Sequence, residues 1–199
     1  MKKSNLMKVS LGLAFFVGSV LIAYFAVKNL YSVYPNLPVL KDFLFWYLPS
    51  LDLLFLSNII ITLTCLSFIF FVVSKNKFKE SIFYTTTISV YYLIRSVLIY
   101  LTPLADPYRG QYINNFLVFP SGGMFPSGHT GLMTLLLLFT LKEKPKFWKI
   151  YFAILLVLEM ATLILSRAHY SIDIVGALFI AYGIWKISDE HFKKKLTLE

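Results

Sequence analysis

The stretch that decides the fold runs from Val9 to Val27 and reads VSLGLAFFVGSVLIAYFAV, without a charged residue. An α-helix needs about 20 such residues to cross the hydrocarbon core of a bilayer. Lys2, Lys3 and Lys8 precede the stretch, as in a secretory signal peptide. The stretch is longer than a signal core and no convincing small-residue cleavage site follows it, so we interpret it as a first membrane span.

Five more apolar stretches follow. We expect spans from about Leu51 or Ser57 to Val73, from Ser81 to Leu101, from Pro126 to Leu141, from Ile150 to Leu165 and from Ser171 to Ile187. Backbone groups in lipid need partners within their own segment, and no strand-like alternation at barrel spacing appears, so these segments are predicted helices. The sequence thus predicts an all-α integral membrane protein, a six-helix bundle forming one domain over residues 1–199.

The composition excludes a soluble globular protein, because 58% of the residues are hydrophobic and only 15% are charged. A formal net charge of +9 could indicate a nucleic-acid partner in a polar protein, but here the lysines flank apolar stretches. Topology and anionic lipid explain them better, so we expect the bilayer and no nucleic acid as a partner. A single cysteine, Cys65, leaves no intrachain disulfide and no thiolate metal cluster.

Alternating the six spans sorts the basic residues by side. One side receives Lys2, Lys3, Lys8, Lys75, Lys77, Lys79, Lys142, Lys144, Lys146, Lys149, Lys186, Lys193, Lys194 and Lys195. The other side receives Lys28, Lys41, Arg109 and Arg167, and Arg95 is embedded in the third span. Basic residues are enriched on the cytoplasmic side, so both termini are predicted to be cytoplasmic. Four aromatic residues of the first outer connection are expected at headgroup depth: Tyr31, Tyr34, Trp46 and Tyr47.

The segment Pro126-Ser127-Gly128-His129 reads as a turn that begins a helix at the outer surface. Free N–H groups at a helix start bind anions, and Gly128 would let a phosphate approach the backbone closely. The hydroxyl of Ser127 can donate a hydrogen bond, and the imidazole of His129 lies beside the same spot. Taken alone, the segment is more typical of an ordinary loop-to-helix junction than of a binding site.

The next outer helix end reads Ser-Arg-Ala-His-Tyr-Ser-Ile-Asp over residues 166–173 and contains His169 and Asp173. Four residues on a helix leave two side chains roughly 40° apart around the axis, so the Asp173 carboxylate can accept the imidazole Nδ1–H and present Nε2. A nucleophilic or basic histidine needs this orientation. The alternative is a helix-capping histidine with an aspartate that favours the helix dipole.

Topology brings the two motifs to one side of the membrane. Arg95 belongs to the same region, because it lies six residues, or roughly 9 Å, from the outer end of its span. An arginine inside a membrane is functional by default. It could bind a phosphate or pair with Glu159, which lies equally far from the outer end of its own span.

These residues resemble the membrane-bound type 2 phosphatidic acid phosphatase superfamily, and most closely its sphingomyelin synthase branch. The resemblance covers about residues 95–185 and rests on Ser-Gly-His-Thr at 127–130 and His-Tyr-x-Ile-Asp at 169–173. A third agreement lies upstream, in residues at the spacing of the branch's Arg, Tyr, Thr, Leu, Pro segment: Arg95, Tyr100, Thr102, Leu104 and Pro107.

The resemblance implies six spans, an extracytoplasmic or lumenal site and no metal requirement. We expect a location in the cell membrane and no cofactor. The resemblance further implies that His169, oriented by Asp173, attacks the phosphorus of a phospholipid or lipid phosphate, while His129 protonates the leaving alkoxide. Water or a lipid alcohol then accepts the phosphoryl group. We expect Arg95, Ser127, Gly128 and Arg167 to bind the substrate phosphate.

Two departures disfavour an ordinary lipid phosphate phosphatase, which remains the alternative. The chain contains no Arg-Pro dipeptide, and Arg167 stands two residues before His169, where the phosphatases place arginine further upstream. Ala105 occupies a position where the synthase branch usually has proline. Donor and acceptor therefore stay open. Rival classes are a bis-histidine haem protein and a non-catalytic membrane protein of the same fold.

Overall fold

The protein is helical throughout the residues described by its computed structural model, which are 3–34, 36–107, 124–144 and 146–193. No strand occurs among them. In chain order the elements are α1 (Lys3–Val33), α2 (Leu44–Tyr47), α3 (Leu54–Ser74), the 3-10 helix η1 (Lys77–Glu80), α4 (Ser81–Leu101), α5 (Gly128–Thr140), α6 (Phe147–Leu165) and α7 (Ser171–His191).

Five helical stretches are long and apolar enough to cross a membrane: Val9–Leu30, Leu54–Ser74, Lys77–Leu101, Phe147–Leu165 and Ser171–His191. α5 is apolar but has only 13 residues. That length gives about 20 Å, which is less than the roughly 30 Å of a hydrocarbon core. The protein is therefore an all-helical multi-pass membrane protein with five candidate spans, and the sixth span stays a prediction.

The apolar stretches of the sequence predict where each long helix lies, but they predict the first and last residues of the helices less well. The stretch from Ser81 to Leu101 coincides with α4, whereas α1 extends beyond the stretch from Val9 to Val27 at both ends. Lysine is a good helix former, so a helix continues through polar flanks after the lipid-facing part has ended. α2 was not predicted because it is a single turn within the connection from Tyr31 to Ser50.

α5 occupies the centre of the bundle, where it packs against α3, α4, α6 and α7. Buried aromatic rings dominate the core beside it: Phe68, Phe71, Phe83, Tyr84, Tyr91, Phe139, Trp148 and Phe152. α1 packs mainly against α4. Large apolar side chains such as Leu66, Phe70 and Phe179 are exposed on outer faces, which suits contact with lipid.

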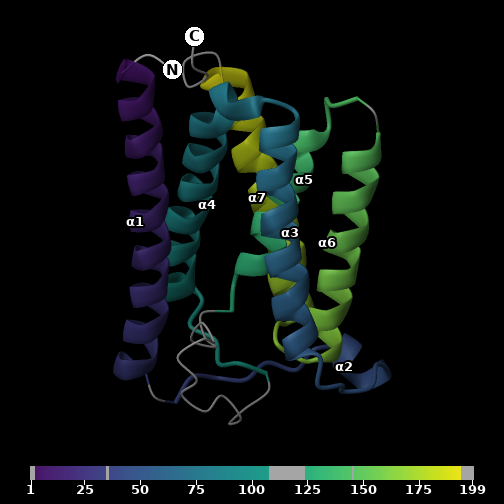
Figure 1. Ribbon diagram of the computed structural model, residues 1–199. Helices are drawn as coiled ribbons and strands as arrows, with labels where there is room; N and C mark the ends of the chain where they lie inside the picture. Colours follow the sequence, from purple (N-terminus) through teal and green to yellow (C-terminus); the bar gives the residue numbers. More distant parts are fainter. Residues whose placement is uncertain (1–2, 35, 108–123, 145, 194–199) are drawn as a thin grey trace.

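Successive long helices run in opposite directions (Figure 1). α1 begins and α7 ends at the same end of the bundle, which is the upper end in this view. α4 and α6 end toward the opposite end, where α2 lies and toward which the starts of α5 and α7 face. Both histidine motifs therefore lie toward one end of the bundle.

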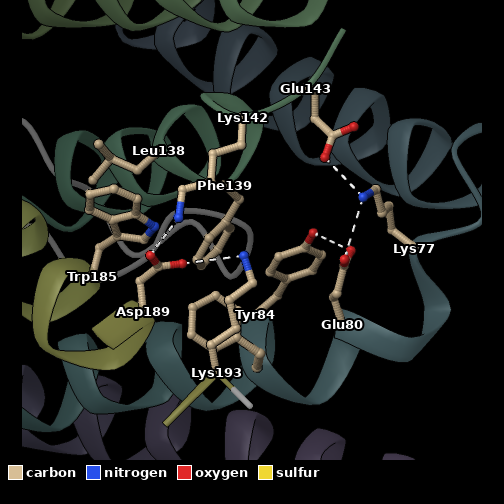
Figure 2. Close-up of a pocket in the computed structure, with 11 residues that line it drawn as sticks. Lys77, Glu80, Tyr84, Leu138, Phe139, Lys142, Glu143, Trp185, Asp189 and Lys193 are labelled. Carbon is tan, nitrogen blue, oxygen red and sulfur yellow. Dashed lines mark hydrogen bonds and ion pairs between the residues drawn. The ribbon is translucent and has the colours of Figure 1, made fainter. Parts of the chain in front are cut away.

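Ion pairs surround a cavity at the other end (Figure 2). Lys77 contacts Glu143 at 2.9 Å, and Asp189 contacts both Lys142 at 2.7 Å and Lys193 at 3.2 Å. The pair of Asp189 and Lys142 joins α7 to the residues just after α5, and the pair of Lys77 and Glu143 joins η1 to the connection between α5 and α6. These pairs hold together the end of the bundle opposite His129 and His169.

Candidate active site

His169 lies in the turn between α6 and α7, and not on a helix as the sequence had led us to expect. α6 ends at Leu165 and α7 begins at Ser171, with Arg167 between them in the left-handed region at a φ of 53°. Asp173 still reaches back, because it is the third residue of α7. Its Oδ2 accepts the N–H of Tyr170 at 2.9 Å and lies 3.3 Å from Nδ1 of His169.

Asp173 therefore both caps α7 and contacts the imidazole of His169, while the N-cap residue of α7 is Tyr170 and not the histidine expected in the capping alternative. The Asp173 side chain is fully buried, while that of His169 is 13% exposed. Burial lowers the pKa of His169 below its ordinary value, and the hydrogen bond that the Asp173 carboxylate accepts opposes this. The charges of His129 and Arg95 lower it further. The balance favours a neutral His169 imidazole.

His129, on the first turn of α5, pairs with a carboxylate from the neighbouring helix α6. Its Nδ1 lies 2.8 Å from Oε1 of Glu159, whose side chain is fully buried. Ser57 of α3 donates its hydroxyl to the same oxygen at 2.6 Å. The His129 side chain is 34% exposed, so the ring can present its other edge away from the buried pair.

The start of α5 is held from two neighbouring helices. The hydroxyl of Tyr91 on α4 donates to the carbonyl of Ser127 at 2.7 Å, and the N–H of Ser127 donates to the carbonyl of Asp173 at 3.1 Å. Ser127 is buried and caps α5, because its Oγ accepts the N–H of Thr130 at 3.3 Å. The two histidine motifs are thus joined through their backbones.

Arg95 of α4 lies directly against this helix start. Its Nε donates to the carbonyl of Pro126 at 2.9 Å. A Cβ placed on Gly128 would lie 3.3 Å from that Nε, so the absence of a side chain there lets the guanidinium approach the α5 backbone. Glu159 was considered only as a partner of Arg95, and the ion pair described for it is with His129.

Arg167 contacts the outer connection that contains α2. Its Nη2 donates to the carbonyl of Phe45 at 3.3 Å, and its Cζ lies 5.4 Å from the centre of the Phe45 ring. Asp42 of the same connection accepts the N–H of Ser171 at 2.6 Å. This connection therefore covers the turn that carries His169. Arg109 lies outside the described residues.

Sequence reasoning did not identify Ser57, and it considered Glu159 only as a partner of Arg95. A buried glutamate near the outer end of a span was the available signal, but its partner depends on which helices are neighbours. Across the described residues, no cluster of three or more His, Cys, Asp or Glu side chains is placed to hold a metal ion. What the site offers chemically is two imidazoles, each contacting a carboxylate through Nδ1.

Comparison with known protein families gives a match to the C-terminal part of the chain. Residues 122–190 match the family model described as PAP2 superfamily C-terminal, which is about a third of the chain. Both histidine motifs and Glu159 lie inside the matched region, whereas Ser57 and Arg95 lie outside it. No curated protein gives a match. The match supports the PAP2 superfamily, which usually indicates phosphatase activity and a lipid phosphate substrate.

Proposed function

We propose that this PAP2-like protein transfers a phosphoryl group from a phospholipid or lipid phosphate through a phosphohistidine intermediate. One observation carries the proposal: two histidine motifs 40 positions apart in sequence are joined at one end of the bundle through the hydrogen bond between Ser127 and Asp173. His129 and Arg95 also act electrostatically on His169. The family match at residues 122–190 supports the same class of reaction.

His169 is the nucleophile in this proposal. A nucleophilic imidazole must be unprotonated at Nε2, and the lowered pKa of His169 favours that state at neutral pH. The contact between Nδ1 and Asp173 keeps the remaining ring proton on Nδ1 and stabilises the positive charge that develops during attack. Nε2 is then left to form the bond to phosphorus.

His129 is the proton donor to the leaving alkoxide. It is the more exposed of the two imidazoles, and because its Nδ1 contacts the buried Glu159 carboxylate, its Nε2 is the ring atom left to donate a proton. Arg95 and the backbone N–H groups at Gly128 are well suited to bind the phosphate oxygens, since a helix start and a guanidinium both attract anions. Ser127 and Arg167 would support this subsite by fixing the helix start and the His169 turn.

The acceptor decides whether the protein is a transferase or a phosphatase. We favour transfer to a lipid alcohol, as in the sphingomyelin synthase branch, because the Arg-Pro dipeptide typical of the phosphatases is missing from the chain. Hydrolysis with release of inorganic phosphate is the alternative. In both cases the substrate enters from the bilayer, which suits a site at the end of a helical bundle.

We further propose six spans with α5 as the short fourth one, both termini in the cytoplasm and the site at the extracytoplasmic face of the cell membrane. Lysines gather around the cavity at the end opposite the histidines, which supports this orientation (Figure 2). Labelling of single cysteines placed in each loop of a Cys65→Ala background, from one side of sealed membranes, tests it.

The decisive experiment is reconstitution with phospholipid labelled on phosphorus, with and without ceramide or diacylglycerol. A new labelled phospholipid indicates transfer, whereas labelled phosphate or phosphoalcohol indicates hydrolysis. A rapid quench into base preserves a phosphohistidine, which releases its label in acid. We expect this acid-labile label on the wild-type protein.

Variants assign the label to a residue. His169→Ala should abolish the label, and Asp173→Asn should lower turnover by roughly 10²-fold to 10⁴-fold, as loss of an orienting carboxylate does in other histidine sites. His191→Ala is the matched control, because this histidine is exposed at the far end of α7. Wild-type turnover in His169→Ala would refute the proposal.

A further inference from the structure

We infer that Glu159 and Ser57 form a positioning pair that keeps His129 as the protonated acid of the site, an inference that rests on the proposed function. The pair joins three helices at one oxygen atom. Oε1 of Glu159 on α6 lies 2.8 Å from Nδ1 of His129 on α5 and 2.6 Å from the hydroxyl of Ser57 on α3.

Burial of the Glu159 carboxylate destabilises the fold unless the carboxylate has a charge partner and hydrogen bonds. The Glu159 side chain is fully buried and Ser57 is 2% exposed. A buried carboxylate costs several kcal/mol without a charge partner and hydrogen bonds. The only cationic side chain that any described ion pair gives Glu159 is His129, so a protonated imidazole is its natural counterion. The other oxygen lies 3.5 Å from the Thr162 hydroxyl.

Comparison of the two histidine pairs explains why they take different roles. Oδ2 of Asp173 accepts the Tyr170 N–H at 2.9 Å and also lies 3.3 Å from Nδ1 of His169. Glu159 contacts His129 at 2.8 Å, and the His129 ring is also the more exposed one. The closer carboxylate pair belongs to the ring that must carry the extra proton, and the weaker pair to the ring that must lack it.

The remaining charged groups near His129 fit this division. Arg95 of α4 lies at the start of α5, where its Nε donates to the carbonyl of Pro126, and the backbone carbonyl of Asp173 accepts the N–H of Ser127. His169 is neutral in the reacting state, so it does not compete for the proton. Glu159 of α6 supplies the opposing charge that lets His129 stay protonated beside Arg95.

The pair acts in both halves of the reaction. In the first half, Nε2 of His169 bonds to phosphorus as the bond from phosphorus to the lipid oxygen breaks, and that oxygen takes the Nε2 proton of His129. In the second half, neutral His129 accepts the proton of the incoming hydroxyl, whose oxygen bonds to phosphorus as the bond to His169 breaks. Glu159 stabilises the imidazolium at the start and end of this cycle.

Leaving-group dependence distinguishes this role from a structural one. Phosphatidylcholine leaves a strongly basic alkoxide that needs a proton, whereas 4-nitrophenyl phosphorylcholine leaves a phenolate that does not. In single turnovers we expect Glu159→Gln to slow release of the lipid alcohol from phosphatidylcholine by roughly 10²-fold. Release of 4-nitrophenol should slow by about threefold or less. Phosphatidic acid and 4-nitrophenyl phosphate replace these substrates if the wild-type protein prefers monoesters.

Three further variants complete the test. Glu143→Gln is the matched control, since it removes a carboxylate from an ion pair at the opposite end of the bundle. Ser57→Ala keeps the carboxylate and should produce a smaller loss with the same leaving-group dependence, even if Glu159→Gln fails to fold. Adding Glu159→Gln to His129→Ala should cause no further loss, because a positioning residue acts through its partner.

Rescue by a shorter carboxylate gives an independent readout. Glu159→Asp should restore part of the phosphatidylcholine turnover that Glu159→Gln loses, because it returns an acceptor for Nδ1 of His129. The inference would be overturned if Glu159→Gln slowed release of both leaving groups equally, or if it lowered the turnover of His129→Ala further. Either result would leave the proposed function intact. A wild-type protein that releases neither leaving group refutes the proposed function and the inference with it.

Discussion

Gly131 is the position at which a single methyl group should disturb the site most. A Cβ added to Gly131 would lie 1.9 Å from Cζ and 2.0 Å from the hydroxyl oxygen of Tyr91. The ring must retreat by about 1.5 Å before the contact reaches an ordinary 3.4 Å. Tyr91 is completely buried in the aromatic core and donates to the carbonyl of Ser127, so its ring cannot retreat without breaking that bond.

We expect Gly131→Ala to lower the free energy of unfolding by about 2–4 kcal/mol. Overpacking of a core costs roughly 1–3 kcal/mol, and loss of a buried hydrogen bond adds roughly 1 kcal/mol. Alanine gains less than about 1 kcal/mol of helix propensity over glycine, which offsets little of this. Because the broken bond holds the start of α5, turnover should fall as well.

Denaturant unfolding in detergent measures the stability change, and phospholipid turnover measures the effect on the site. Gly183→Ala is the matched control, since nothing lies within 4 Å of its added Cβ. It should be neutral or slightly stabilising. Equal stability of the two alanine variants would refute the packing of Tyr91 against Gly131.

Three other predictions follow from the site. Turnover should fall in acid with a midpoint below the ordinary histidine value of 6.5, because His169 reacts only when neutral, and Asp173→Asn should move this limb lower still. Asp42→Ala should lower the melting temperature by removing the 2.6 Å bond at the start of α7, at a cost of about 1–3 kcal/mol, and Asp42→Asn should cost less. Arg167→Ala should speed hydrogen exchange in α2 by releasing Phe45, and unchanged exchange would argue against this contact.

The sequence could predict the helices because lipid imposes one rule on every span. An apolar stretch in lipid must be helical, so the predicted bounds of α4 match the observed ones at both ends. α2 was missed because a helix of four residues leaves no periodic signal in the sequence. The aromatic side chains expected at the interface include Trp46 and Tyr47, and both are exposed.

In the site, the sequence could predict a contact between residues of one segment, but it could not predict a contact between two helices. His169 and Asp173 are only four residues apart, so their side chains can meet whether His169 is helical or lies in the turn before α7. In either case the connecting backbone is short enough for the carboxylate to reach the ring. The pairing of His129 with Glu159 instead depends on which faces of α5 and α6 meet. Hydrophobicity alone does not specify the rotation of each helix about its axis. The sequence therefore suggested Arg95 as the partner of Glu159, with a phosphate as the alternative partner of Arg95.

The oxygen of Glu159 that joins three helices also has a consequence for biosynthesis. Ser57 enters the membrane early, His129 and Glu159 follow in turn, and His169 emerges only just before the last helix. Under the proposed mechanism, a nascent chain therefore places its acid, His129, before its nucleophile, His169, has been synthesised. The proposed turnover would begin only after α7 has entered the membrane and the Asp173 carbonyl has accepted the Ser127 N–H.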